Sequence, residues 1–247
     1  MSFGSYWRAA REPRYSVTFA LPLFLLYEGL AASVSHSAFT GVRNGADVLL
    51  KTMFIALGGR NGLLVFGVLS LGACVALVVR DYRRHPGPLS FRVLGGMVAE
   101  SMVYAALFAV VAGTLTTLLL HPTLAVVQGS TSPLDRMPLT TQLVVSLGAG
   151  VYEELLFRVV LVSGLTSAGR ALWWPAWLAT GVAIVVSALI FSAFHYVGPY
   201  GDTLTLGSFT YRAVGGLLFS GLYVARGFGI TAWTHALYDV GLSLLTS

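Results

Sequence analysis

Residues 62–79 read GLLVFGVLSLGACVALVV and contain no charged side chain. A helix needs about 20 predominantly apolar residues to cross the hydrocarbon core of a bilayer, so this stretch predicts a membrane-spanning helix. Arg80 follows directly and begins a basic loop that contains Pro86 and Pro88. A loop of this kind is typical of the membrane surface. The stretch therefore predicts that the chain lies in a membrane.

The composition of the whole chain supports this prediction. Of 247 residues, 56% are apolar and 10% are charged, and the mean hydropathy is +0.78. Soluble domains have about 25% charged residues, so a soluble enzyme, a disordered chain and a disulfide scaffold are excluded. The single cysteine, Cys74, cannot form an internal disulfide. The net charge of +5 comes from arginines in short loops, which the positive-inside rule explains without a nucleic-acid partner.

Further apolar stretches predict an all-α, polytopic transmembrane bundle of about seven spans. The expected spans cover residues 15–35, 62–79, 93–120, 139–165, 178–197, 211–224 and 228–245. Residues 41–60 carry charges at helical spacing, which predicts an interfacial helix or a loop rather than a span.

The arginines also predict the orientation of the chain. With a cytoplasmic N-terminus, nine arginines lie inside and five basic residues outside, in agreement with the positive-inside rule. The inside set is Arg8, Arg11, Arg14, Arg80, Arg83, Arg84, Arg92, Arg170 and Arg226. The long apolar run after Arg14 predicts a retained signal anchor. We expect an integral protein of the inner cell membrane of a prokaryote, and predict no particular oligomeric state.

Ionisable side chains in the C-terminal spans are the exception to this apolar pattern. Such a side chain is costly in hydrocarbon, so it indicates a paired or functional group. Glu154 and Arg158 are four residues apart and can pair on one helix face. The same spacing separates residues 191 and 195, and residues 235 and 239. The group comprises Glu153, Glu154, Arg158, Phe191, His195, His235 and Asp239.

Two carboxylates and two imidazoles in a low-dielectric interior can hold and polarise a water molecule. Adjacent residues of an α-helix point about 100° apart, so one glutamate is expected to face the water while the other pairs with Arg158. At about 1.5 Å per residue, Glu153, His195 and His235 lie roughly 21, 26 and 12 Å from the inner ends of their spans. Spacing alone therefore does not bring them to one depth.

Each of these groups also allows a structural interpretation. A buried Glu–Arg pair can clamp two helices, and a His–Asp pair can be a packing hydrogen bond. A histidine at a helix end can lie at the interface, and Phe191 is expected to pack rather than react. Glu28 and Glu100 lie in expected spans outside any motif, so we interpret them as internally bonded helix-contact groups.

A zinc site is a further alternative, because two histidines and a carboxylate with an open position form a known catalytic set. Its ligands would be Glu153, His195, His235 and Asp239. The sequence contains no HExxH segment that would anchor this alternative.

Three motifs together resemble one known family. The segment Glu153-Glu154-Leu-Leu-Phe-Arg158 resembles the EExxxR motif of the CPBP family, the CAAX-protease and bacteriocin-processing intramembrane enzymes. Residues 191–195, FSAFH, resemble its FxxxH motif, and residues 235–239, HALYD, its HxxxN/D motif. The likeness covers residues 140–244. We therefore divide the chain into N-terminal membrane helices with an interfacial segment, 1–138, and a core peptidase region, 139–247.

The resemblance implies a glutamate-dependent intramembrane endopeptidase that acts on a membrane-associated or lipidated peptide or protein. It also implies catalysis without a metal or other cofactor, so we favour this over the zinc alternative. It implies that Glu153 and His195 activate the attacking water, and that Glu154 and Arg158 shape and charge-balance the site. It further implies that His235 and residue 239 stabilise the oxyanion, for which one donor is often worth about 3–4 kcal/mol.

Position 239 departs from the family pattern, because the similar prenyl-protein CAAX endopeptidases usually have asparagine there. An amide can donate a hydrogen bond, whereas an ionised aspartate cannot. Either Asp239 is protonated, or it accepts a hydrogen bond from His235 and fixes that ring as the donor. We favour the second alternative.

Two other classes of protein fit the same residues. One is a non-catalytic membrane scaffold or immunity protein that retains the fold. The other is a proton-coupled transporter, whose polar residues would line a path through both leaflets. The polar residues here gather in the C-terminal spans, which favours a site over a path.

Overall fold

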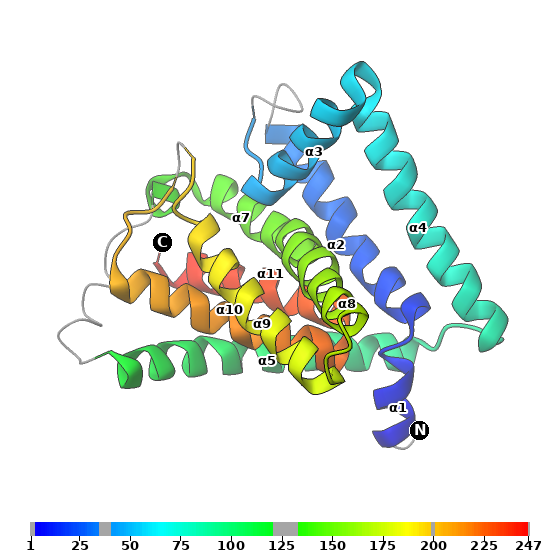
Figure 1. The fold of residues 1–247 in the computed structure, drawn as a ribbon. Helices are drawn as coiled ribbons and strands as arrows, with labels where there is room; N and C mark the ends of the chain where they lie inside the picture. Colours follow the sequence, from blue (N-terminus) through cyan, green and yellow to red (C-terminus); the bar gives the residue numbers. More distant parts are fainter. Residues whose placement is uncertain (1–2, 35–40, 121–132, 199–200, 247) are drawn as a thin grey trace.

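The computed structural model describes residues 3–34, 41–120, 133–198 and 201–246, and its elements there are all helical. Their order is α1 (Phe3–Ala9), α2 (Pro13–Val34), α3 (Gly45–Gly58), η1 (Gly59–Asn61), α4 (Gly62–Arg84), α5 (Phe91–Leu119), η3 (Pro133–Arg136), α7 (Leu139–Gly148), η4 (Ala149–Val162), α8 (Ser163–Ala171), α9 (Ala176–Phe194), α10 (Leu206–Arg226) and α11 (Phe228–Thr246). The predicted all-α class is confirmed (Figure 1). Ser35, His36, His121 and most of the polar segment 122–138 lie outside the described residues.

Four helical stretches of the described chain are long and apolar enough to cross a membrane. They are α2, the hairpin of α3, η1 and α4, then α5, and finally α9. Large apolar side chains on these helices face outward, such as Leu64 at 69% and Leu118 at 76% exposure. Apolar residues are stable on an outer surface that contacts lipid, so the protein is an integral membrane protein. The number of seven spans stays a prediction.

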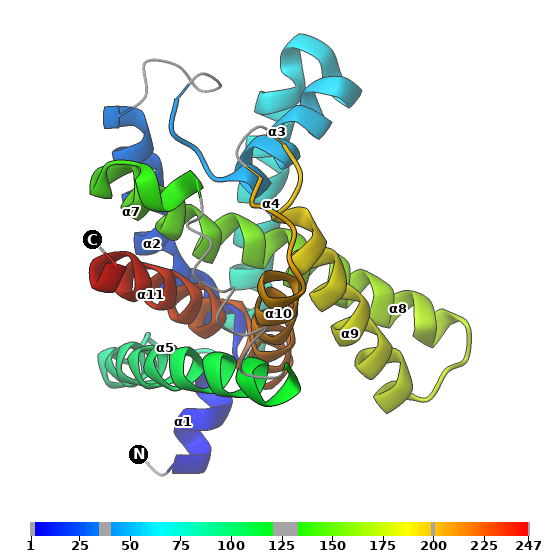
Figure 2. The ribbon, with the colours of Figure 1, turned by 90° about the vertical axis from the view of Figure 1, so that its left-hand side faces the viewer.

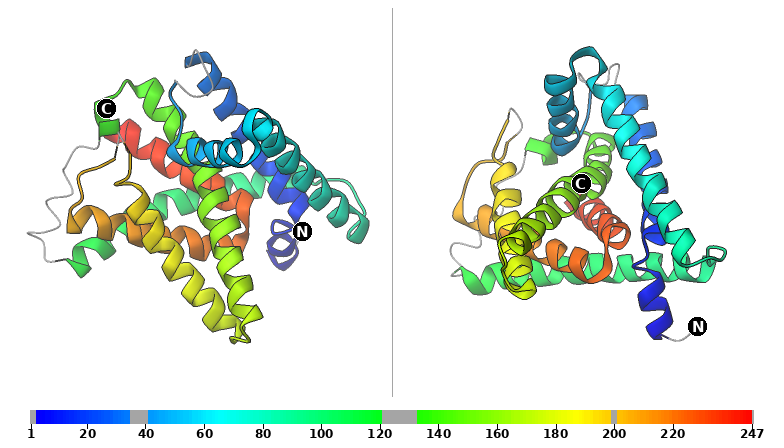
Figure 3. Two further views of the ribbon diagram at one scale, coloured as in Figure 1. Left: turned by 45° about the horizontal axis from the view of Figure 1, so that its top comes forward. Right: turned by 45° about the vertical axis from the view of Figure 1, so that its right-hand side comes forward.

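Helix α11 lies inside the bundle, between α2, α5, α7, η4 and α10 (Figure 2). Glycines permit its closest contacts. A Cβ atom at Gly150 of η4 would lie 2.5 Å from the carbonyl oxygen of Ala232, and one at Gly229 would lie 2.6 Å from that of Ser16. Helix α4 and the α8–α9 pair lie at the outside of the bundle (Figure 3). The bundle therefore surrounds α11, which carries the third polar motif.

The segment η4 is a π-helix, which the sequence did not predict. At its end the amide of Ser163 donates to the carbonyl of Arg158, five residues earlier. π-Helical turns are rare and frequently occur at functional sites. Glu153, Glu154 and Arg158 all lie on this segment, so the first motif has a wider helical turn than the α-helix that we expected.

Residues 45–58 form a helix, but its charges do not point to a membrane surface. The side chain of Asp47 is fully buried, and those of Arg43 and Lys51 are 7% and 12% exposed. Both basic groups contact Glu28 of α2, at 2.9 and 3.3 Å. The expected interfacial segment therefore turns its charged face inward, because another helix supplies its partners. Glu28 is internally bonded, as predicted.

Candidate functional site

The three motifs converge although they lie on three separate helices. Glu153 and Glu154 project from η4, His195 directly follows α9, and His235 lies on α11. Both α9 and α11 pack along η4. This packing brings Glu153, His195 and His235 together, although counting residues along each span placed them at different depths. Glu154 is fully buried, and Glu153 and His235 are 6% and 3% exposed. The two glutamates and His235 therefore form a buried polar cluster inside apolar helices, whereas His195 and Asp239 are partly exposed.

The second glutamate of the pair, Glu154, holds two partners. Its Oε1 lies 3.1 Å from Nη1 of Arg158, so the predicted i, i+4 pairing is confirmed. The same oxygen lies 2.6 Å from Nδ1 of His235, on the neighbouring helix. An N–H group on Nδ1 donates to the carboxylate, and this contact fixes the orientation of the His235 ring.

The first glutamate, Glu153, has one bound and one free oxygen. Its Oε1 accepts a hydrogen bond of 2.8 Å from the amide Nδ2 of Asn44. Its Oε2 makes no hydrogen bond with any described residue and lies 3.9 Å from Nε2 of His195. The Nδ1 atom of His195 lies 2.8 Å from the carbonyl oxygen of Phe191, which can only accept. The ring proton is thus assigned to Nδ1, and Nε2 presents a lone pair to Glu153.

The contact between His235 and Asp239 is longer than we expected. Nε2 of His235 lies 3.4 Å from Oδ2 of Asp239, against 2.6 Å between Nδ1 and Glu154. Glu154 is therefore the closer acceptor for this ring, and the choice between the two alternatives for Asp239 stays a prediction. A carboxylate oxygen therefore lies near each ring nitrogen of His235.

Aromatic rings enclose the cationic side of the site. The guanidinium of Arg158 lies 4.4 Å from the ring centroid of Phe191, which also meets His195 edge-on at 4.7 Å. Phe219 of α10 stacks on the His235 ring, with centroids 4.3 Å apart and planes 20° apart. Phe191 packs as predicted, and its contacts orient two charged or polar groups. No motif in the sequence pointed to Phe219.

Sequence reasoning also missed Asn44. This residue caps the N-terminus of α3, where its Oδ1 accepts from the amide of Ala46 at 2.8 Å. Its backbone amide donates to the Tyr27 hydroxyl, which in turn donates to Asp47. Asparagine before an apolar helical stretch is a recognisable cap signal. Nothing in the sequence, however, relates it to a glutamate 109 residues away.

The described residues contain one group of three possible metal ligands with ligand atoms within 4.8 Å of one another, formed by Glu12, Asp81 and His85. These residues lie at the start of α2 and the end of α4. Arg14 forms ion pairs with both carboxylates, at 2.9 and 3.4 Å. The four residues considered for zinc do not form such a group in the described part of the chain.

Comparison with known proteins adds one finding. Residues 135–241 match the family model described as type II CAAX prenyl endopeptidase Rce1-like. The matched range contains η4, α9, α10 and the motif of α11. No curated protein and no solved structure matches the chain.

Proposed function

Because the chain belongs, through residues 135–241, to the CAAX protease family, we propose that this membrane peptidase is a metal-free intramembrane endopeptidase of the glutamate type. One observation carries the proposal. The carboxylate of Glu153 has one oxygen held by Asn44, while its other oxygen faces the Nε2 lone pair of His195 at 3.9 Å. Glu153 and His195 would therefore act as a pair on one small polar molecule.

That molecule would be the attacking water. A separation of 3.9 Å is too long for a hydrogen bond between the two residues, but a water molecule can donate to both acceptors. Glu153 would take a proton from this water as the general base, and the hydroxyl would attack the peptide carbonyl. The proton would then pass from Glu153 to the leaving amine. General bases of this kind contribute roughly 10²–10⁴-fold to the rate.

The oxyanion would be stabilised from α11. Protonated on both nitrogens, His235 would keep Nδ1–H on Glu154, and its Nε2–H, whose contact with Asp239 is long at 3.4 Å, would donate to the developing negative charge. The carboxylate of Asp239 favours the proton on Nε2, and Arg158 balances the charge of Glu154. Asp239 would thus support the donor rather than donate itself.

The buried position among apolar helices favours a membrane-associated or lipidated peptide or protein as substrate, cut within the bilayer or at its edge. Comparative proteomics of cells with the wild-type chain and with Glu153→Gln tests the proposal. We expect membrane proteins to accumulate in uncleaved form in the variant. Identical protein profiles would contradict the peptidase function and favour a scaffold that retains the fold.

A chelator tests the metal-free mechanism. The substrate found by proteomics would be cleaved by purified protein in proteoliposomes, with and without EDTA. We expect the cleavage rate to be unchanged. Loss of activity that added zinc restores would contradict the proposal and support the zinc alternative.

The orientation also has a consequence for the site. Arg14 donates a hydrogen bond to the carbonyl oxygen of His85, and Arg226 donates one to the carbonyl oxygen of Trp7. The basic loops therefore share one face of the bundle. We propose that this face is cytoplasmic in a prokaryotic inner membrane. His195 lies at the far end of α9, so the site would open toward the other side of the membrane.

Thiol labelling of intact cells tests this orientation. In a Cys74→Ser background, Thr203→Cys should react with a membrane-impermeant reagent, whereas Arg83→Cys should not. The reverse pattern would contradict a cytoplasmic N-terminus.

A further inference from the structure

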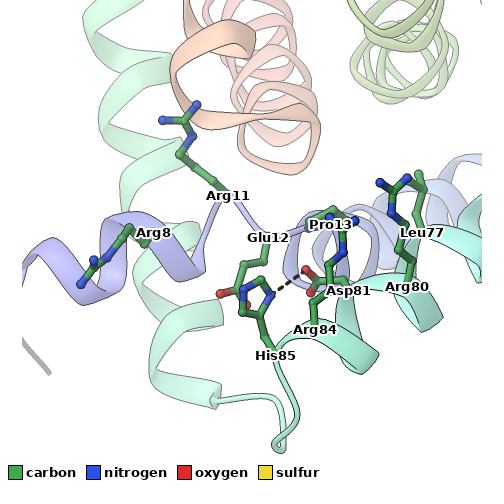
Figure 4. Close-up of a pocket in the computed structure, with 9 residues that line it drawn as sticks. All are labelled: Arg8, Arg11, Glu12, Pro13, Leu77, Arg80, Asp81, Arg84 and His85. Carbon is green, nitrogen blue, oxygen red and sulfur yellow. Dashed lines mark hydrogen bonds and ion pairs between the residues drawn. The ribbon is translucent and has the colours of Figure 1, made fainter.

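A cavity of about 360 Å³ opens where α1, the start of α2 and the last turns of α4 meet (Figure 4). Two arginines line it on each side. Arg8 and Arg11 come from α1 and the turn that follows it, and Arg80 and Arg84 come from α4. All four are exposed, on the face of the bundle that carries the basic loops.

The charges in this cavity do not cancel. Its two carboxylates, Glu12 and Asp81, are paired with Arg14, which lies behind them and is 11% exposed. The guanidinium groups of Arg8, Arg80 and Arg84 make no hydrogen bond or ion pair within the described residues. Arg11 makes one hydrogen bond, of 3.3 Å, to the carbonyl of Val224. The cavity therefore offers several unused N–H donors and a surplus of positive charge.

The cavity also adjoins the apolar surface of the bundle. Leu77 lines it and is 45% exposed, and it belongs to the uncharged stretch 62–79. Two aromatic residues of the same region, Tyr82 and Phe91, are 55% and 88% exposed. Exposed aromatic side chains beside arginines are typical of the level of lipid headgroups. The cavity thus combines a basic wall with an apolar one at the expected membrane surface.

From this combination we propose that the cavity binds the headgroup phosphate of an anionic phospholipid. The planar guanidinium groups of Arg80 and Arg84 bind the phosphate oxygens, and Arg8 and Arg11 complete the site from the other side. The acyl chains of the lipid lie along Leu77. Basic pockets on the cytoplasmic side of membrane helices bind anionic headgroups in this way. The site anchors α1 against α4 and does not depend on the peptidase activity.

Native mass spectrometry of the purified full-length chain in detergent tests this site. Dioleoyl phosphatidylglycerol is the probe, and dioleoyl phosphatidylcholine is the zwitterionic control. We expect one phosphatidylglycerol to be retained per chain under conditions that remove phosphatidylcholine. The double variant Arg80→Gln, Arg84→Gln should weaken this retention by roughly tenfold or more.

The matched control is the double variant Arg83→Gln, Arg92→Gln. It removes the same charge from exposed residues of the same face that do not line the cavity, so retention should change less than about threefold. Equal losses in both double variants would overturn the proposal and indicate diffuse surface electrostatics. Displacement of the lipid by equimolar inorganic phosphate would also overturn it, because the site would then take free phosphate.

A second double variant guards against local misfolding of α4. Arg8→Gln, Arg11→Gln changes the opposite wall of the cavity and leaves the membrane-spanning helices intact. We expect it to weaken retention of phosphatidylglycerol as well, at an unchanged helical circular dichroism. Full retention in this variant and in the α4 variant would overturn the site.

Discussion

Two fully buried arginines, Arg226 at the end of α10 and Arg158 in η4, have different surroundings. Each of the three guanidinium nitrogens of Arg226 donates a hydrogen bond. Its Nε and Nη2 donate to the two oxygens of Glu100 at 2.5 and 2.7 Å, and its Nη1 donates to the carbonyl of Trp7 at 3.0 Å. The guanidinium also lies 3.7 Å from the Trp7 ring centroid. Glu100, which we predicted to be internally bonded, further accepts from the Tyr6 hydroxyl.

Arg158 carries the same charge, but its guanidinium makes no hydrogen bond with the described residues. Its Nε and both Nη atoms have no hydrogen-bond partner among the described residues, although Nη1 lies 3.1 Å from Glu154. Its guanidinium is held instead over the ring of Phe191. A saturated pair such as Arg226–Glu100 stabilises a fixed arrangement of helices. A buried guanidinium without hydrogen-bond partners can stabilise negative charge that develops nearby, which suits a catalytic site.

The largest effect should come from the two glutamates that distinguish these regions. Glu153→Gln removes the proposed base but retains the size of the side chain, so we expect the cleavage rate to fall by roughly 10³-fold with little change in thermal stability. Glu100→Gln is the matched control, because it neutralises a glutamate in the structural pair. It should lower the melting temperature and leave the rate per folded molecule nearly unchanged. Cleavage assays and thermal unfolding in the same detergent measure both.

Substitution of Arg226 and of Arg158 tests whether the first residue mainly stabilises the fold and the second mainly supports activity. Arg226→Gln leaves the largely enclosed carboxylate of Glu100 with only the Tyr6 hydroxyl, and we expect the free energy of unfolding to fall by about 3–5 kcal/mol. Arg158→Gln leaves Glu154 its contact with His235, so the loss of stability should be smaller and the loss of kcat larger. Denaturant unfolding and kinetics on refoldable protein would separate the two effects. Equal profiles for both variants would remove the distinction between a structural and a functional arginine.

The sequence predicted contacts within one helix, but it did not predict contacts between helices. The Glu154–Arg158 pair was predictable because both residues lie on one helix at a spacing of four. The contact between Asn44 and Glu153 was not, because tertiary packing alone brings these positions together. The inward charges of α3 were missed for a similar reason, since their partner Glu28 lies on another helix. The π-helix was missed because the spacing of Glu154 and Arg158 also fits an ordinary α-helix.

Asn44 allows a test of how the base is positioned. Asn44→Asp keeps the oxygen that caps α3, but it replaces the amide donor to Glu153 by a second carboxylate. We expect kcat to fall by roughly 10²-fold with a smaller change in KM, because the base loses its orientation. Asn44→Ala, which loses the cap as well, should also lower the melting temperature. A rate unchanged in Asn44→Asp would show that this amide does not position Glu153.

The smallest effect is expected at the position that departs from the family pattern. Glu154 holds the His235 ring more closely than Asp239 does, so Asp239→Asn should lower kcat by less than about tenfold, since an asparagine amide can itself donate to the oxyanion. Asp239→Leu offers neither charge nor donor and should lose more activity than Asp239→Asn. If Asp239→Asn instead lost as much activity as Glu154→Gln, the ring would depend equally on both carboxylates. His235 would then be held by all its partners, as Arg226 is, and would differ in this from Arg158, whose guanidinium has no hydrogen-bond partner among the described residues.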